Sequence, residues 1–123
     1  MRALPLLVVC LVAAATAVAA GGPKLSAPKR VAFGEELVVK GSRWPVIEFC
    51  KRTVRLSLRS DQNAFAIGRA RVRRNGRFAF SYPVSAAHVG RGDWRLRAKL
   101  PCESGDDGSP NPVVRSRRVR ITD

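Results

Sequence analysis

Two stretches of the sequence alternate apolar and polar residues with a period of two, and they constrain the fold more than any other feature. Residues Thr53–Arg59 have the sequence Thr-Val-Arg-Leu-Ser-Leu-Arg, and residues Asp93–Cys102 continue as Asp-Trp-Arg-Leu-Arg-Ala-Lys-Leu-Pro-Cys. A period of two places apolar side chains on one face of a strand and charged side chains on the other. The two stretches therefore predict neighbouring antiparallel strands that share one buried face.

A single register joins these strands to a pair of cysteines. If Leu56 lies opposite Leu96, two more apolar pairs align and Cys50 lies opposite Cys102. A slip by one residue would turn one strand over, so the parity is strongly specified. Opposed residues of antiparallel strands are close enough for a disulfide. The sequence therefore predicts a disulfide between Cys50 and Cys102.

The N-terminal residues have the three parts of a secretory signal peptide. Arg2 is followed by an apolar stretch at 6–15 and then by Ala17-Val18-Ala19-Ala20, which has the form of a small-residue cleavage site. This order is typical of a cleaved export signal. We expect a signal peptide at residues 1–20 and a single mature domain at residues 21–123. The apolar stretch is too short to span a bilayer, and the sequence predicts no transmembrane segment. A secreted, extracellular protein that could remain with the cell wall is expected.

The cysteine content agrees with an oxidising compartment. Cys10 lies within the expected signal peptide, and Val9 before it is not the small residue of a bacterial lipobox, which disfavours a lipid anchor. Two cysteines then remain in the mature chain, and in an exported protein two thiols most simply form one disulfide.

Five further segments complete the expected set of strands, and their turns carry specific predictions. Gly68 predicts a bulge, because the apolar residues are odd-numbered before it (Phe65, Ile67) and even-numbered after it (Ala70, Val72). The loop Arg74–Gly76 predicts a three-residue hairpin that sets Val72 opposite Phe78, with Gly76 in the left-handed conformation. In the last segment Arg115 and Arg117 share the parity of Val119, which predicts a bulge near Ser116 or pairing over the second half only. The segments are Lys24–Ala27, Glu35–Gly41, Phe65–Val72, Arg77–Tyr82 and Val113–Ile121.

Seven short strands separated by turns about every ten residues predict a two-sheet antiparallel sandwich. At Gly41–Pro45, at Asn75–Phe78 and in its cysteine pair, the chain resembles immunoglobulin-like domains of secreted bacterial proteins of the actinobacterial type. The resemblance implies an all-β, seven-strand immunoglobulin-like antiparallel β-sandwich after an N-terminal signal peptide. It also implies a non-enzymatic binding or structural module of the secreted or cell-surface kind.

The neocarzinostatin family is a more distant resemblance, because it is also an exported sandwich of similar length. It implies an alternative function, a small-ligand carrier that holds a chromophore in an apolar cleft. That family has two short-range disulfides, whereas this chain has one long-range pair. Such a carrier would need a cleft near Trp44 and the loop that contains Asp106.

Charge is the strongest functional signal in the composition. The formal net charge is +14, which favours anionic cell-wall polymers, glycans or other polyanions as partners. The predicted register sets Arg55 opposite Arg97 and Arg59 opposite Asp93, and opposed like charges are unfavourable. Two interpretations stay open: a solvated basic face enriched in arginine by genome composition, or a surface for anionic polymers. The candidate anion-binding residues are Arg55, Arg59, Arg95, Arg97, Lys99, Arg118 and Arg120.

Aromatic residues limit the kind of polyanion. Trp94 and Phe80 are expected to point inward, so the outer face has no platform for stacking bases, and sequence-specific nucleic-acid recognition is not expected. Trp44 is open to two interpretations, a plug at one end of the sandwich or an exposed ring that stacks on a sugar.

The inventory for catalysis and metal binding is poor. His88 is the only histidine, and it lies in an expected loop with no nucleophile beside it, as catalysis would require. Asp106-Asp107-Gly108 lacks the ligand count and spacing of a calcium loop. We therefore expect no enzymatic activity, no metal and no cofactor.

Overall fold

The structure is a computed structural model, and it describes residues 22–123. The expected signal peptide at 1–20 and Cys10 lie outside the described residues. Within the described range, no helix has the length and apolar character needed to cross a membrane.

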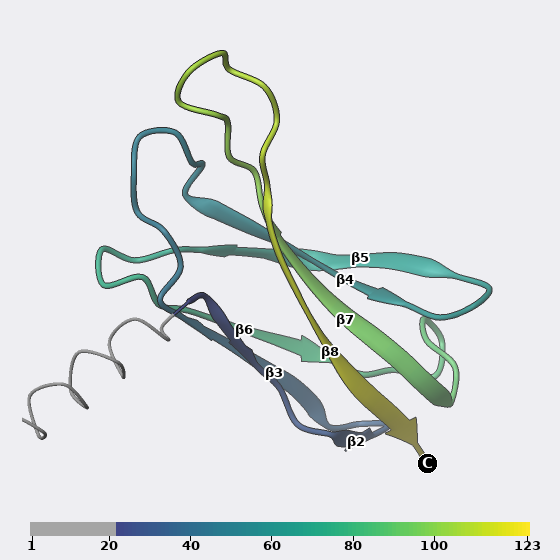
Figure 1. The fold of residues 1–123 in the computed structure, drawn as a ribbon. Coiled ribbons are helices and arrows are strands. Elements are labelled where there is room, and N and C mark those ends of the chain that lie inside the picture. Colours follow the sequence, from purple (N-terminus) through teal and green to yellow (C-terminus); the bar gives the residue numbers. More distant parts are fainter. Residues whose placement is uncertain (1–21) are drawn as a thin grey trace, which may run out of the picture.

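Eight strands form two sheets (Figure 1). The three-stranded sheet has the order β1-β3-β6, and the five-stranded sheet has the order β2-β8-β7-β4-β5. This arrangement confirms the expected all-β immunoglobulin-like sandwich, with one strand more than predicted. The strands are β1 (Lys24–Ser26), β2 (Arg30–Ala32), β3 (Glu36–Ser42), β4 (Thr53–Arg59), β5 (Ala64–Arg71), β6 (Phe78–Pro83), β7 (Gly92–Leu100) and β8 (Val113–Thr122).

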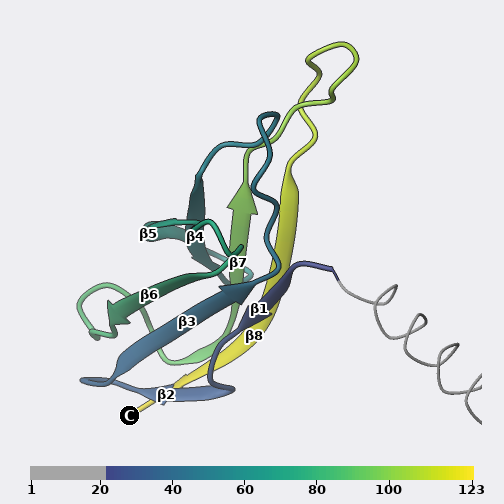
Figure 2. The same ribbon diagram turned by 90° about the vertical axis from the view of Figure 1, so that its left-hand side faces the viewer.

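The core lies between the two sheets, which form separate layers in Figure 2. Alternate residues of β4 and β7 are buried, among them Leu56, Leu58 and Leu96. The three-stranded sheet contributes Leu37 and Val39 from β3 to the same core. The period of two therefore identified correctly which side of each of these strands is buried.

The register between β4 and β7 differs by two residues from the one predicted. Leu56 lies opposite Ala98, and Leu58 lies opposite Leu96. Cys50 and Cys102 still face each other across an isolated bridge, so the residues between Cys50 and β4 take up two extra positions. A shift of two leaves every side chain on its predicted face.

β2 is the strand that the sequence did not predict, and it is parallel to β8. Arg30 lies opposite Arg120 and Val31 opposite Ile121, so the five-stranded sheet is mixed rather than wholly antiparallel. A segment of three residues has too few positions to show a period, and its strand conformation depends on pairing with β8.

The bulge in β5 is confirmed, but the hairpin between β5 and β6 is not. The register with β4 shifts between Leu56 and Ser57, opposite Gly68 and Ala66. The tight turn closes as expected, since the Arg73 N–H donates to the Arg77 carbonyl at 2.8 Å and Gly76 has a φ of 79°. The chain then crosses between layers, because β5 pairs with β4 and β6 pairs with β3. The predicted pairing of Val72 with Phe78 is therefore wrong, although both residues are buried.

The last strand also corrects a prediction. β8 pairs with β7 without a break from Val113 to Ile121, with no bulge near Ser116. Arg115 and Arg117 have the parity of the buried residues, but they lie at the edge of the sandwich, where their side chains bind backbone carbonyls of β1 and of the residue just before it. The Nε of Arg115 donates to the Pro23 carbonyl at 3.0 Å, and the Nε of Arg117 donates to the Leu25 carbonyl at 2.7 Å. These arginines therefore connect the two sheets.

Candidate anion-binding site

The outer face of the five-stranded sheet gathers cations from all five strands. Side chains with the parity opposite to the buried residues point away from the other sheet. All but one of the charged residues at these positions are arginine or lysine, and the exception is Asp93. We call this set the basic face: Arg30, Arg55, Arg59, Arg69, Arg71, Arg95, Arg97, Lys99, Arg118 and Arg120.

The seven residues named from the sequence all lie on the basic face. The structure adds Arg30 from β2, and Arg69 and Arg71 from β5. Arg69 and Arg71 alternate with the buried Ala70 and Val72. The sequence signal for these two arginines was therefore available, but it was assigned to a hairpin with β6 rather than to the edge of this sheet.

Two rows of like charges cross the basic face perpendicular to its strands. In one row Arg59 lies opposite Arg95, and Arg95 lies opposite Arg118. In the other row Arg55 lies between Lys99 and Arg69. The predicted oppositions of Arg55 with Arg97 and of Arg59 with Asp93 are wrong, because the register is shifted by two. The correction raises the density of like charges, since Arg59 loses an acidic partner and gains a basic one.

The acidic compensation on the basic face is weak. Asp93 lies opposite Arg120, and the Nε of Arg120 is 4.0 Å from the Asp93 Oδ1, with both side chains well exposed. Among the described residues, the other ion pair joins Arg91 to Asp123, outside the strands. Like charges that lie directly opposite each other on adjacent strands destabilise a sheet, and cross-strand pairs of this kind are worth roughly 0.2–1 kcal/mol each. The like charges of the basic face therefore have little acidic compensation within the described residues.

A hollow of about 550 Å³ lies on the basic face over β4, β5 and β7. Its centre is formed by short side chains, because Ser57 lies opposite Ala66 on one side and opposite Arg97 on the other. Long cationic side chains surround this centre. We call it the central hollow, and its charged lining residues are Arg55, Arg59, Arg69, Arg97 and Lys99.

Trp44 is a structural residue rather than a ligand-stacking ring. Its side chain is 2% exposed, its Nε1 donates to the Lys24 carbonyl at 2.9 Å, and its ring meets Phe78 edge-on with the centroids 5.4 Å apart. Of the two interpretations made from the sequence, the plug is confirmed and the exposed stacking ring is wrong.

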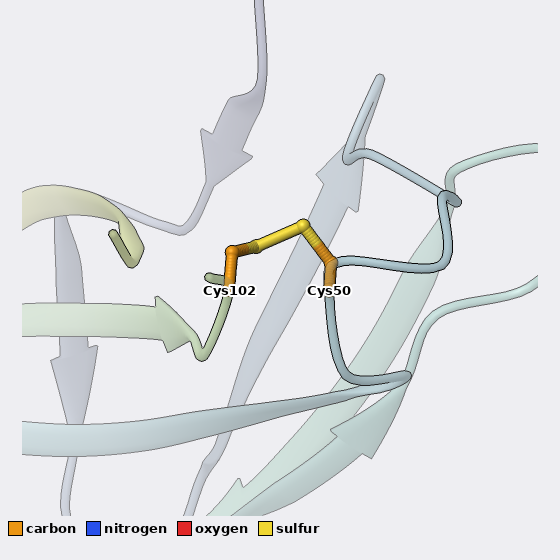
Figure 3. The surroundings of a disulfide bond; sticks show 2 residues. All are labelled: Cys50 and Cys102. Atoms are coloured by element: carbon orange, nitrogen blue, oxygen red, sulfur yellow. A yellow bond between two sulfur atoms is a disulfide. The ribbon is translucent and has the colours of Figure 1, made fainter. Parts of the chain in front are cut away.

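The end of the sandwich that carries the disulfide has a different chemistry. Cys50 and Cys102, whose Cα atoms are 3.9 Å apart, join the segment before β4 to the end of β7 (Figure 3). The loop between β7 and β8 continues beyond both sheets (Figure 1). A second hollow of about 270 Å³ beside the disulfide includes Phe49 but also Glu48 and Glu103. It is smaller than the central hollow and has charged residues in its lining, unlike the apolar cleft that a chromophore carrier would need.

The loop after Cys102 contains acidic residues, and Asp107 among them binds the backbone of that loop. In the loop after Cys102, the Ser109 N–H donates to the Asp107 Oδ1 at 2.9 Å. This hydrogen bond, and further ones from the Ser109 and Ser104 side chains, hold the pKa of Asp107 below the ordinary value of an aspartate. His88 lies in the exposed turn between β6 and β7, where its backbone N–H donates to the Ser85 carbonyl at 3.0 Å.

No family model and no curated protein matches the sequence. Among solved structures, one titled as a structure of murine CRIg is similar to this chain. The match covers 83% of this chain and 98% of that one, with 14% sequence identity and a TM-score of 0.44. The immunoglobulin-like arrangement is identified by the strand order itself.

Proposed function

We propose that this chain is an exported, non-enzymatic binding module of the cell surface or its surroundings, whose basic face contacts anionic polymers. The observation that carries the proposal is the pair of cationic rows, in which like charges face each other on adjacent strands and neither row contains an acidic residue. Binding of a polyanion would relieve this repulsion.

The chemistry of the cations supports the same function. Nine of the basic-face residues are arginine, counted from the set defined above, and a guanidinium group makes paired hydrogen bonds to phosphate and carboxylate groups. The basic face has no aromatic side chain at its outward positions, which argues against recognition of stacked bases. Export is supported by the composition of residues 1–20 and by the disulfide.

The test is retention of the oxidised protein on immobilised heparin, teichoic acid and DNA across a salt series. A variant with Arg55, Arg95 and Arg97 changed to alanine removes three cations from the basic face. A matched variant with Arg73, Arg74 and Arg77 changed to alanine removes three exposed cations from the turn between β5 and β6. Both variants have the same net charge.

We expect the basic-face variant to elute at much lower salt, with the slope of log K against log [salt] reduced by about 2, while the turn variant changes little. Equal elution of the two variants would contradict the proposal, since it would show that net charge rather than the basic face determines binding.

A further inference from the structure

We propose that the central hollow is a site for successive phosphate groups of a base-free phosphate polymer, and that it provides most of the affinity of the basic face. This inference rests on the proposed function and adds to it a location and a ligand class. Its charged lining is entirely basic, with cations from β4, β5 and β7.

The hollow has a physical cause in the sequence. Ser57 and Ala66 lie opposite each other, and both are short, whereas the residues around them are long. Arg55 and Arg59 lie two positions from Ser57 along β4, about 7 Å away, and Arg97 lies directly opposite Ser57, about 5 Å away. An anion above Ser57 would thus be approached by cations from three sides.

The bulge in β5 contributes to this geometry. Ala66 and Gly68 lie opposite consecutive residues of β4, so that Ile67 is the extra residue. Downstream of the bulge Arg69 points outward opposite Arg55. Gly68 lies under the ring of Phe80, which occupies the space that a Cβ would need at this position. The contact with Phe80 fixes β5 where the bulge occurs, and with it the position of Arg69.

A neighbouring hollow provides an internal comparison. A depression of about 530 Å³ is lined from β7, β8 and the segment before β2, and it also contains several cations. Asp93 is part of its lining, close to Arg120. The two hollows are similar in size, but they differ in their acidic lining residues. The neighbouring hollow contains Asp93, whereas the lining of the central hollow has no carboxylate to neutralise its cations.

The arrangement favours phosphate at high density and without bases. Along β7 the cations Arg95, Arg97 and Lys99 recur every second residue, roughly every 7 Å, so a glycan with widely spaced carboxylates would leave most of them unmatched. A phosphate polymer can offer one anion to each cation. Because the outward positions contain no aromatic ring, bases attached to the polymer would add no stacking energy.

The experiment compares two triple variants of the full, oxidised chain that carry the same net charge. The hollow variant has Arg55, Arg69 and Lys99 changed to glutamine. The distal variant has Arg30, Arg95 and Arg118 changed to glutamine, which removes three cations from the same basic face outside the lining of the central hollow. Affinity for inorganic polyphosphate and for poly(glycerol phosphate) is measured by titration across a salt series, and thermal unfolding verifies that each variant is folded.

We expect the hollow variant to lose at least about tenfold in affinity at moderate salt, and the distal variant to lose several-fold less. An equal loss in the two variants would overturn the central hollow as the main site while supporting the basic face as a whole. No loss in either variant would overturn the proposed function as well.

The ligand class is tested with matched probes of the unaltered protein. Oligo(dT) and an abasic oligodeoxynucleotide of the same length share one phosphate backbone, and we expect equal affinities for them. Tighter binding of oligo(dT) by tenfold or more would overturn the base-free assignment in favour of single-stranded nucleic acid.

Hyaluronan, whose carboxylates are widely spaced, is expected to bind weakly, and affinity equal to that for polyphosphate would overturn the requirement for dense phosphate. The ratio of affinities for polyphosphate and poly(glycerol phosphate) distinguishes a free polymer from a wall polymer as the source.

Discussion

The two sheets of this sandwich have outer faces of different character. On the three-stranded sheet the outward positions of β3 alternate Glu36, Val38 and Lys40, and the Ser81 hydroxyl donates to the Glu36 Oε2 at 2.8 Å. On the five-stranded sheet the outward charged positions are cationic with Asp93 as the exception. Genome composition acts on the whole chain and would enrich both faces. Of the two outer faces, that of the five-stranded sheet is therefore the one with a dense set of cations.

The largest effect that tests this comparison concerns the disulfide, which lies at the end of the sandwich and away from both faces. Replacing Cys50 and Cys102 with alanine should lower the free energy of unfolding by roughly 4 kcal/mol, because the bridge closes a loop between residues 52 apart in the sequence. Denaturant titration measures this loss.

The salt slope of polyanion binding should be unchanged in the same variant at temperatures where it is folded, because the pairing of β4 with β7 does not include the bridge. A folded variant with a reduced slope would show that the geometry of the basic face depends on the loops.

The next effect separates two adjacent arginines of β8. Arg117 donates to the Leu25 carbonyl of the opposite sheet, whereas Arg118 lies on the basic face opposite Arg95. Arg117→Ala should cost about 1 kcal/mol of stability through the lost hydrogen bond, with a small effect on polyanion affinity. Arg118→Ala should have the opposite profile, with stability unchanged or slightly raised and affinity lowered. Chemical unfolding and binding titrations of both variants measure the two quantities, and parallel behaviour would contradict the division of roles.

These arginines also show which features of the structure could be predicted from the sequence and which could not. The alternation at Thr53–Arg59 fixed the strand to its observed ends, and it placed Arg55 and Arg59 on the correct face. In the last strand Arg117 has the parity of the buried Val119, and this led to the wrong prediction of a bulge or of pairing over the second half only. The partner of Arg117 could not be predicted, because the Leu25 carbonyl is 92 residues distant in the sequence and belongs to the other layer. Periodicity reports which face a side chain occupies, whereas a contact between sheets depends on how they pack.

Several of the errors concern how a strand is placed relative to its neighbours, rather than which of its faces is buried. The register of β4 was inferred from Cys50, but the residues between the cysteine and the strand contain two extra positions. The turn at Gly76 was correctly located, yet its flanking strands pair in different sheets. The hollow over Ser57 was not predictable, since it requires Ala66 to lie opposite, and that depends on the bulge in β5.

A smaller effect tests the like-charge repulsion directly. Arg59→Glu places an acid opposite Arg95 and should raise the free energy of unfolding by roughly 0.2–1 kcal/mol at low salt, while it weakens polyanion binding. The matched change on the other sheet is Lys40→Glu, whose opposed residues are Ser26 and Ala79, and it should leave both stability and binding nearly unchanged. Thermal unfolding at two salt concentrations is the measurement. A gain that persists in high salt would show that repulsion is not its cause.

The smallest effect concerns Asp107, whose carboxylate accepts a hydrogen bond from the backbone of its own loop, whereas the cations of the basic face have little acidic compensation. The pKa of Asp107 is lowered in the folded state, chiefly by the hydrogen bond from the Ser109 N–H. A lowered folded pKa means that the carboxylate stabilises the fold above its unfolded pKa, and that this contribution is lost as the pH falls through the folded pKa. Asp107→Asn retains an acceptor for the Ser109 N–H but cannot titrate, so it should remove this part of the acid dependence.

Unfolding measured between neutral pH and about pH 3 in both proteins tests this expectation, with Asp106→Asn as the neighbouring control. An Asp107→Asn variant whose stability still falls with acid as steeply as that of the unaltered protein would place the acid sensitivity in other carboxylates.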